Sequence, residues 1–109
     1  MTDPSPTPPR SGFADVAPGL AAYTDDVLFG DMWKRPGLSQ RDRSLITVAT
    51  LVALYRINEL PFHFKRALDN GVTREELGEL ITHLAFYAGW PTAASAVPIA
   101  RKVFAEADG

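Results

Sequence analysis

Apolar residues recur at helical spacing along most of the chain, and no segment shows the strict alternation of apolar and polar residues that is typical of a surface strand. From Phe13 onward the pattern predicts five helices joined by short loops. The predicted helices cover residues 17–29, 39–56, 58–70, 73–88 and 91–105. The sequence therefore predicts an all-α fold.

The ends of the predicted helices carry capping signals. Thr73 and Glu76 have the spacing of a capping box, in which each side chain accepts a hydrogen bond from the other residue's backbone N–H, and Gly89 is suited to end the same helix. Ser39 is a good N-cap for the second helix. Pro98 lies inside the last helix, and we expect it to kink that helix or delay its start, because proline lacks an N–H.

The second predicted helix is apolar nearly all round from Leu45 to Leu54. In a small protein this pattern indicates burial on more than one side. A second copy of the chain is the simplest source of the additional cover, so we expect a homo-oligomer.

The composition is that of an ordinary globular protein, with 46% hydrophobic and 22% charged residues among 109. This length predicts one domain over residues 13–109, preceded by a proline-rich, disordered tail over residues 1–12. The tail has the features of neither a signal peptide nor a membrane span, so we expect a cytoplasmic protein.

Net charge and cysteine content exclude several classes of function. A net charge of -2 provides no basic surface, so we expect no binding to nucleic acid or to an anionic membrane. The chain has no cysteine, which excludes disulfides, thiol nucleophiles and cysteine-ligated zinc.

Glu59 and His63 are the first candidates for chemistry, because their i,i+4 spacing places a carboxylate beside an imidazole on one helix face. Histidine is the usual general acid near neutral pH, and the carboxylate would orient it. Both residues also have a purely structural interpretation. A hydrogen bond between them contributes about 1 kcal/mol to stability without any substrate, and a carboxylate is favoured at a helix N-terminus.

A second group of candidates lies on the fourth predicted helix, where Glu79, His83 and Tyr87 share one face. The alternative is an ordinary polar edge of a packed helix. Arg43 is the candidate anchor for a carboxylate, because its planar guanidinium binds a carboxylate at two points. The alternative is an ion pair with Asp42 or with an acidic residue of another helix. Trp33 either closes a pocket over the substrate or packs within its own loop.

We expect neither a metal nor an organic cofactor. The two histidines lie twenty positions apart and have no obvious third ligand. The sequence also contains no Gly-x-Gly-x-x-Gly motif and no phosphate-binding loop.

Five segments of the chain together resemble the carboxymuconolactone decarboxylase family, in the family's order and spacing from about Ala14 to Phe104. These segments are Phe29–Ser39, Arg41–Leu45, Glu59–His63, Gly71–Glu76 and His83–Pro91. The family contains a redox branch, which has a Cys-x-x-Cys pair, a following histidine and an upstream glutamate. In this chain the histidine corresponds to His63, but the cysteine positions hold Arg56 and Glu59, and the glutamate position holds Ser44.

The resemblance therefore implies the cysteine-free branch. This branch implies an alkylhydroperoxidase D-like helical subunit of about five helices, assembled into a ring-like trimer or hexamer. It also implies decarboxylation, without a cofactor, of a small carboxylated lactone such as 4-carboxymuconolactone in the catabolism of aromatic compounds. Peroxide reduction is not expected, because no thiol is present to be oxidised.

For such an anionic substrate we expect Arg43 to bind a carboxylate and His63, oriented by Glu59, to return a proton to carbon. We expect His83 or a backbone amide to stabilise the oxyanion, with Trp33 and Tyr87 contacting the substrate. The rival interpretation is a non-catalytic, oligomeric module that binds small molecules. A pocket lined by Glu59, His63 and Arg43 would favour the enzyme, whereas a pocket filled by Phe62, Phe86 and Trp90 would favour the module.

Overall fold

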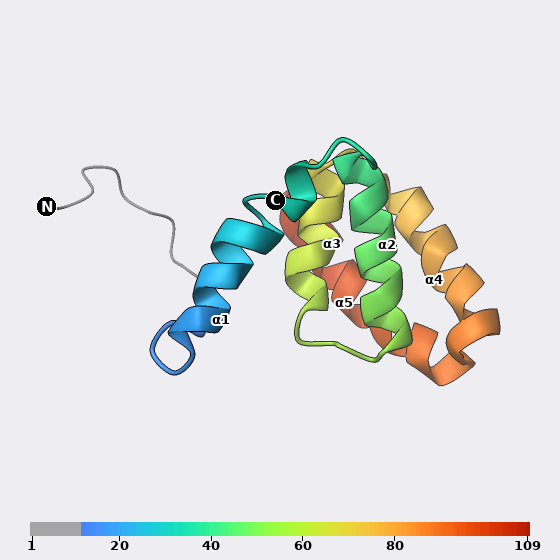
Figure 1. The fold of residues 1–109 in the computed structure, drawn as a ribbon. Coiled ribbons are helices and arrows are strands. Elements are labelled where there is room, and N and C mark those ends of the chain that lie inside the picture. Colours follow the sequence, from blue (N-terminus) through green and yellow to red (C-terminus); the bar gives the residue numbers. More distant parts are fainter. Residues whose placement is uncertain (1–11) are drawn as a thin grey trace, which may run out of the picture. The chain divides into compact units, whose positions relative to one another are not determined.

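The computed structural model describes residues 12–109, which contain helices and no strand (Figure 1). The all-α prediction is therefore confirmed for this part of the chain. The described residues divide into two compact units at the boundary between Gly37 and Leu38. Residues 1–11, which make up nearly all of the predicted tail, lie outside the described residues, and the single domain over 13–109 stays a prediction.

The N-terminal unit contains α1 (Pro18–Ala22), the π-helical turn η1 (Tyr23–Leu28) and the 3₁₀ turn η2 (Met32–Lys34). Pro18 occupies the first turn of α1, where its missing N–H costs no hydrogen bond within the helix. The predicted helix over 17–29 is thus α-helical only in its first part. A side chain at Gly30 would clash with the backbone carbonyl of Asp26, so the chain turns where only glycine fits.

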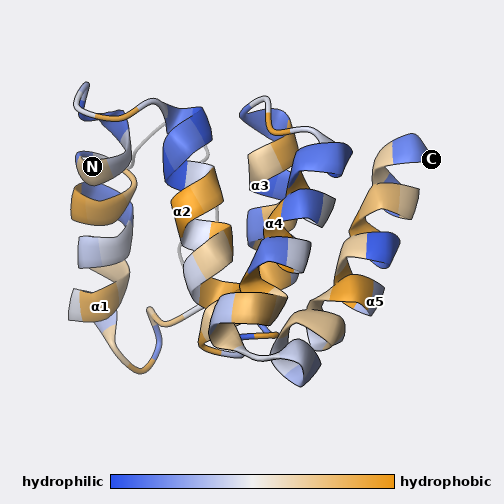
Figure 2. Cartoon of the chain, turned by 90° about the vertical axis from the view of Figure 1, so that its right-hand side faces the viewer, coloured by the Kyte–Doolittle hydropathy of each residue, from blue (hydrophilic) through white to orange (hydrophobic). Residues whose placement is uncertain are grey.

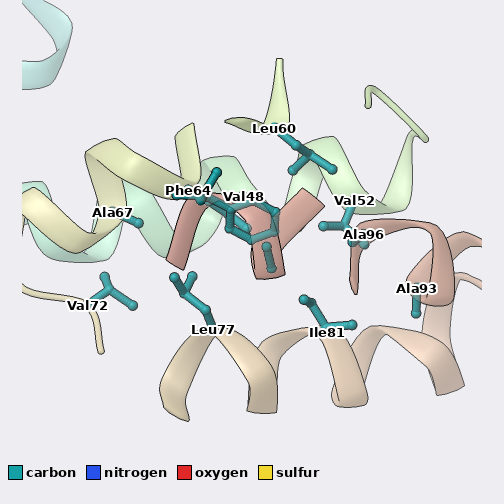
Figure 3. Close-up of a cluster of buried hydrophobic side chains, with 12 residues drawn as sticks. Val48, Val52, Leu60, Phe64, Ala67, Val72, Leu77, Ile81, Ala93 and Ala96 are labelled. Carbon is teal, nitrogen blue, oxygen red and sulfur yellow. The ribbon is translucent and has the colours of Figure 1, made fainter. Parts of the chain in front are cut away.

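The C-terminal unit consists of α2 (Gln40–Ala53), α3 (Leu60–Asp69), α4 (Arg74–Ala88) and α5 (Trp90–Asp108). α2 packs against the other three helices, and α5 packs against α3 and α4 as well. Figure 3 shows apolar side chains from all four helices converging on one core. The labelled core residues are Val48, Val52, Leu60, Phe64, Ala67, Val72, Leu77, Ile81, Ala93 and Ala96.

Most of the predicted helix ends are confirmed. The Ser39 side chain accepts a hydrogen bond from the backbone N–H of Asp42, and Thr73 and Glu76 form the complete capping box. α2 ends three residues earlier than predicted. The third helix was predicted to begin with Asn58 as its cap, but the cap of α3 is Glu59, and it makes no side-chain capping bond.

α5 differs from the prediction in two ways. It begins at Trp90 and continues through Pro98, so its start is not delayed, while the alternative, a kink at Pro98, stays a prediction. The apolar pattern predicts packing through Ala94, Val97, Val103 and Phe104. Val103 is buried and Phe104 packs against the core, but Ala94 and Val97 are exposed, and Ala93, Ala96 and Ala100 form the rest of the buried face. Alanine occurs on several faces of this helix, so its apolar pattern does not single out the face that packs.

The polar and apolar residues of α2 are separated along its length. Figure 2 shows hydrophilic residues in the first turn and mainly hydrophobic residues beyond it. One face of α2 packs into the core through Val48 and Val52, but Ile46 and Leu54 are 53% and 61% exposed. A single chain therefore leaves part of the apolar surface of α2 uncovered.

No helix within residues 12–109 combines the length and the apolar character needed to cross a lipid bilayer.

The capping box provides the first prediction. Thr73→Ala should lower the free energy of unfolding by about 1 kcal/mol (range 0.5–2), because a backbone N–H at the start of α4 loses its acceptor. Thr82→Ala is the matched control on the same helix, because the Thr82 hydroxyl only donates to the Gly78 carbonyl at 2.9 Å. Urea unfolding should show a change within about 0.5 kcal/mol for the control. Equal losses in the two variants would contradict the prediction.

Candidate active site

His63 lies at the end of the first turn of α3, one turn after Glu59. Its backbone N–H donates to the Glu59 carbonyl at 3.2 Å. The imidazole is half-buried with its Nδ1 atom inside the protein, and its ring meets the edge of Phe62 at 4.9 Å between centroids. His63 is therefore a partly desolvated imidazole beside an apolar ring.

Three influences act on the protonation of His63. Burial lowers the pKa of His63 below its usual 6.5, the positive charge of Arg66 lowers it further, and the negative charge of Glu59 raises it. The combined effect favours the neutral imidazole near pH 7. A neutral imidazole accepts a proton well, but it must first gain one before it can act as an acid.

This pKa also links His63 to stability. The unfolded chain binds a proton at His63 below about pH 6.5, whereas the folded chain resists binding it. His63 therefore contributes stability above pH 6.5, and this contribution is lost as the pH falls from 6.5 through the lower folded pKa.

The two arginines near the start of α2 differ in their surroundings. Arg41 forms an ion pair and hydrogen bond with Glu76 of α4. The Thr73 backbone N–H, together with Arg41, lowers the pKa of Glu76. Arg43 is half-buried, and its Nε atom lies inside the protein. Arg41 thus joins two helices, which is consistent with the choice of Arg43 as the candidate anion anchor.

Ser44, the residue that takes the place of the redox glutamate, is buried. Its hydroxyl accepts a hydrogen bond from Asn70 Nδ2 at 3.0 Å. This bond joins the start of α2 to the end of α3, so the position has a structural role in this chain.

His83 lies on α4 and is exposed. Its ring stacks on Tyr87 with 4.7 Å between centroids. A groove of about 380 Å³ between α2 and α4 contains His83. The groove is lined by Leu45, Ala49, Glu76, Glu79, Leu80, His83 and Leu84. His63 is not among these residues, so the two predicted catalytic histidines do not share this groove.

Trp33 belongs to the N-terminal unit, where its ring stacks on Phe29 with 6.0 Å between centroids. Its expected role of closing a substrate pocket stays a prediction.

The rings named for the rival interpretation do not fill a pocket. Phe62, Phe86 and Trp90 are 56%, 75% and 65% exposed, and Phe86 meets Trp90 edge to face at 5.6 Å. A pocket filled by these three rings is therefore not found within one chain. A pocket lined by Glu59, His63 and Arg43, which would favour the enzyme, stays a prediction.

Arg66 is a charged neighbour of His63 that was not among the residues predicted from the sequence. It lies three residues after His63 on α3, is half-buried, and acts electrostatically on His63. The signal was present in the sequence, because Glu59, His63 and Arg66 follow one another at helical spacing on one side of the helix.

Within residues 12–109, no group of three or more His, Cys, Asp or Glu side chains is arranged to hold a metal ion.

The fold and these side chains define an all-helical protein with a half-buried histidine flanked by a carboxylate and a guanidinium. Residues 18–102 match the carboxymuconolactone decarboxylase family, so the chain belongs to that family. The resemblance inferred from the motifs is thereby confirmed.

Three relatives show the range of this similarity. The chain is 47% identical over 76 residues to a 4-carboxymuconolactone decarboxylase of Acinetobacter baylyi, which covers 70% of this chain and 57% of that protein. It is 36% identical over 93 residues to a nitrosuccinic acid decarboxylase of Metarhizium robertsii. The matched region covers 85% of this chain and 64% of that protein. It is 30% identical over 95 residues to an uncharacterised 15.0 kDa protein of Paracoccus denitrificans. The matched region covers 85% of this chain and 71% of that protein. The chain thus spans less than two thirds of the first two relatives.

The charges around His63 give the second prediction. His63 should titrate below pH 6.5, and Glu59→Gln should lower its midpoint further, because the carboxylate that favours the imidazolium is removed. NMR titration of the imidazole protons measures both midpoints, and His83→Asn identifies the His63 signal.

Glu75→Gln is the control for this titration, since Glu75 is an exposed acid in the first turn of α4. It should leave the His63 midpoint unchanged. A His63 midpoint above 6.5, or a rise in Glu59→Gln, would show that burial and Arg66 do not dominate.

Proposed function

We propose that this chain is a cofactor-independent decarboxylase of a small dicarboxylic acid. The observation that carries the proposal is the family match over residues 18–102, together with two relatives that are named as decarboxylases of different acids. The chain covers 57% and 64% of those relatives, so their activities enter here as support for a proposal.

The two acids share a chemical skeleton. In 4-carboxymuconolactone and in nitrosuccinic acid, one carbon carries a carboxylate, a CH₂-carboxylate and a link to an electron-accepting group. The acceptor is the conjugated lactone carbonyl in the first acid and the nitro group in the second. We infer that the substrate of this chain is a succinate whose C2 is attached to such an acceptor, with 4-carboxymuconolactone as the first candidate.

The reaction follows from this skeleton. The bond between C2 and the leaving carboxylate breaks, carbon dioxide departs, and the bonding electrons move into the acceptor, which becomes an oxyanion. One proton then adds to carbon. Because the substrate contains its own electron sink, the protein needs to bind the two carboxylates, stabilise the oxyanion and supply the proton.

We propose that His63, oriented by Glu59, donates the proton to carbon, and that Arg43 binds one carboxylate of the substrate. The half-burial of His63 and Arg43 supports both assignments, since partly desolvated groups interact more strongly with an anion. A backbone amide becomes the preferred oxyanion donor, because His83 lines a groove in which His63 takes no part. Tyr87 stacks on His83, so we place it with His83, and Trp33 stays a candidate cover.

The alternative is a non-catalytic module of the same fold that binds small anions. These 109 residues contain no cysteine and so provide no thiol for peroxide reduction.

The third prediction tests the enzyme directly. The purified protein should release carbon dioxide from 4-carboxymuconolactone, with loss of the substrate's ultraviolet absorbance. His63→Gln should lower turnover by about 10²–10⁴-fold, the range for loss of a positioned proton donor. His83→Gln is the matched control and should retain turnover within about tenfold. Full turnover in a folded His63→Gln variant would show that another group is the proton donor. If no acceptor-substituted succinate releases carbon dioxide, the binding module is favoured instead.

We also propose that the protein works as a homo-oligomer, a trimer or a hexamer. Large apolar side chains are exposed in one chain on α2 (Ile46), directly after α2 (Leu54) and near the α4–α5 turn (Phe86 and Trp90). Such residues mark protein–protein contacts when they gather in large patches.

The fourth prediction follows from this proposal. At micromolar concentration, sedimentation equilibrium should give a mass several times that of the 11.9 kDa chain. Ile46→Glu should shift the equilibrium towards monomer, because it introduces an unpaired charge into the contact. Gln40→Glu, an exposed change in the first turn of the same helix, should not. A monomeric mass for the wild-type protein would contradict the proposal.

A further inference from the structure

Glu59, His63 and Arg66 form a stripe along one side of α3, at spacings of four and three residues. Side chains at these spacings are neighbours on a helix surface. The stripe adjoins the buried face of α3, formed by Leu60, Phe64 and Ala67. An anionic, an imidazole and a cationic group therefore follow one another at the edge of the core.

Arg66 differs from the other cation of α3. Lys65 is an exposed side chain, and its ammonium pairs with Asp69 at 3.2 Å, one turn along the helix. Arg66 is half-buried, and its Nε atom lies inside the protein. Partial burial disfavours the charge of Arg66, since it lowers the pKa of this group, and the nearby Asp69 opposes the effect.

The placement of Arg66 also disfavours positive charge on His63, because two cations on one helix face repel each other. An added carboxylate would reverse this relation. It would bind the guanidinium and favour the imidazolium at the same time. A dianionic substrate supplies such a carboxylate.

The charges on the helices that pack against α3 are distributed unevenly. On α2 the charged side chains are confined to the first turn, as Arg41, Asp42 and Arg43, and residues 44–53 carry none. On α5 the charged residues Arg101, Lys102, Glu106 and Asp108 all lie in the C-terminal half. The charges of Arg66 and Glu59, both on or next to α3, act on His63.

We propose that Arg66 is a second carboxylate-binding residue of the His63 site, and that binding of the substrate's carboxylate at Arg66 brings a proton to His63. The inference rests on the proposed function, because it takes the substrate to be a dicarboxylate. Arg43 binds one carboxylate in this scheme, and Arg66 binds the CH₂-carboxylate that the reaction retains.

The proton balance is complete in this scheme. His63 is neutral in the free protein and takes one proton from water as the dianion binds. After carbon dioxide leaves, the imidazolium donates this proton to carbon and becomes neutral again. The proton donor is thus formed only while substrate is present.

Succinate serves as the probe, because it has both carboxylates of the proposed skeleton and no acceptor, so it cannot react. Calorimetry at pH 7 in buffers of different ionisation enthalpy measures the protons taken up on binding. The wild-type protein should take up a fraction of a proton, and NMR should show that the His63 midpoint rises in the presence of succinate.

Arg66→Gln removes the guanidinium, and Lys65→Gln removes the neighbouring exposed charge as a matched control. In Arg66→Gln the free protein should show a higher His63 midpoint, succinate should bind about tenfold more weakly or worse, and proton uptake should shrink. Lys65→Gln should match wild type in all three measurements. Arg66→Lys keeps the charge without the planar fork and should recover the His63 midpoint but not the full affinity.

Two results overturn the inference. One is succinate binding to the wild-type protein with no proton uptake, and the other is wild-type affinity for succinate in a folded Arg66→Gln variant. Failure of the proposed function can be distinguished from failure of this inference. If no acceptor-substituted succinate loses carbon dioxide while the succinate results hold, Arg66 and His63 form a binding site in a protein that is not a decarboxylase. If decarboxylation occurs but Arg66→Gln leaves KM unchanged, the function stands and the inference does not.

Discussion

The packing of α3 into the core determines the environment of the candidate site. Leu60, Phe64 and Ala67 are buried against the neighbouring helices, and their spacing fixes the rotation of α3 about its axis. His63 and Arg66 lie beside these residues in the sequence, so the same rotation holds them at the edge of the core. Their half-burial is therefore a consequence of how α3 packs.

Half-burial gives these side chains their chemical properties. An exposed imidazole next to a carboxylate would favour its charged form, but burial of His63 reverses this preference, and Arg66 adds to the reversal. In the proposed scheme a carboxylated ligand would change the balance, because its charge would offset that of Arg66. The acid needed for carbon protonation would then form in response to the proposed substrate.

The size of the chain explains its exposed apolar surface. Four helices around one small core can bury only one side of α2 and part of α4 and α5, because a domain of this length has a large surface for its volume. Ile46, Leu54, Phe86 and Trp90 remain exposed. Association of several copies would cover them, and this links the proposed oligomer to the same packing constraint that forms the site.

The sequence by itself determined the helical class, the family and the helix ends that depend on local chemistry. Ser39, Thr73, Glu76 and Gly89 act through hydrogen bonds or backbone angles within a few residues, so their effect can be read from spacing alone. The family followed from motifs whose order and spacing are visible in the sequence. The position of Glu59 one turn before His63 was also visible, because i,i+4 spacing on a helix needs no tertiary information.

Tertiary structure decided the features that depend on which side of a helix is buried. Because alanine occurs on several faces of α5, the sequence did not determine which face packs. Contact with α3 and α4 buries the face that carries Ala93, Ala96 and Ala100. The protonation of His63 followed burial rather than its acidic neighbour, and the position of His83 in a separate groove followed the packing of α4 on α2. Spacing shows which side chains can be neighbours on one helix, but desolvation and the meeting of different helices depend on how the whole core packs.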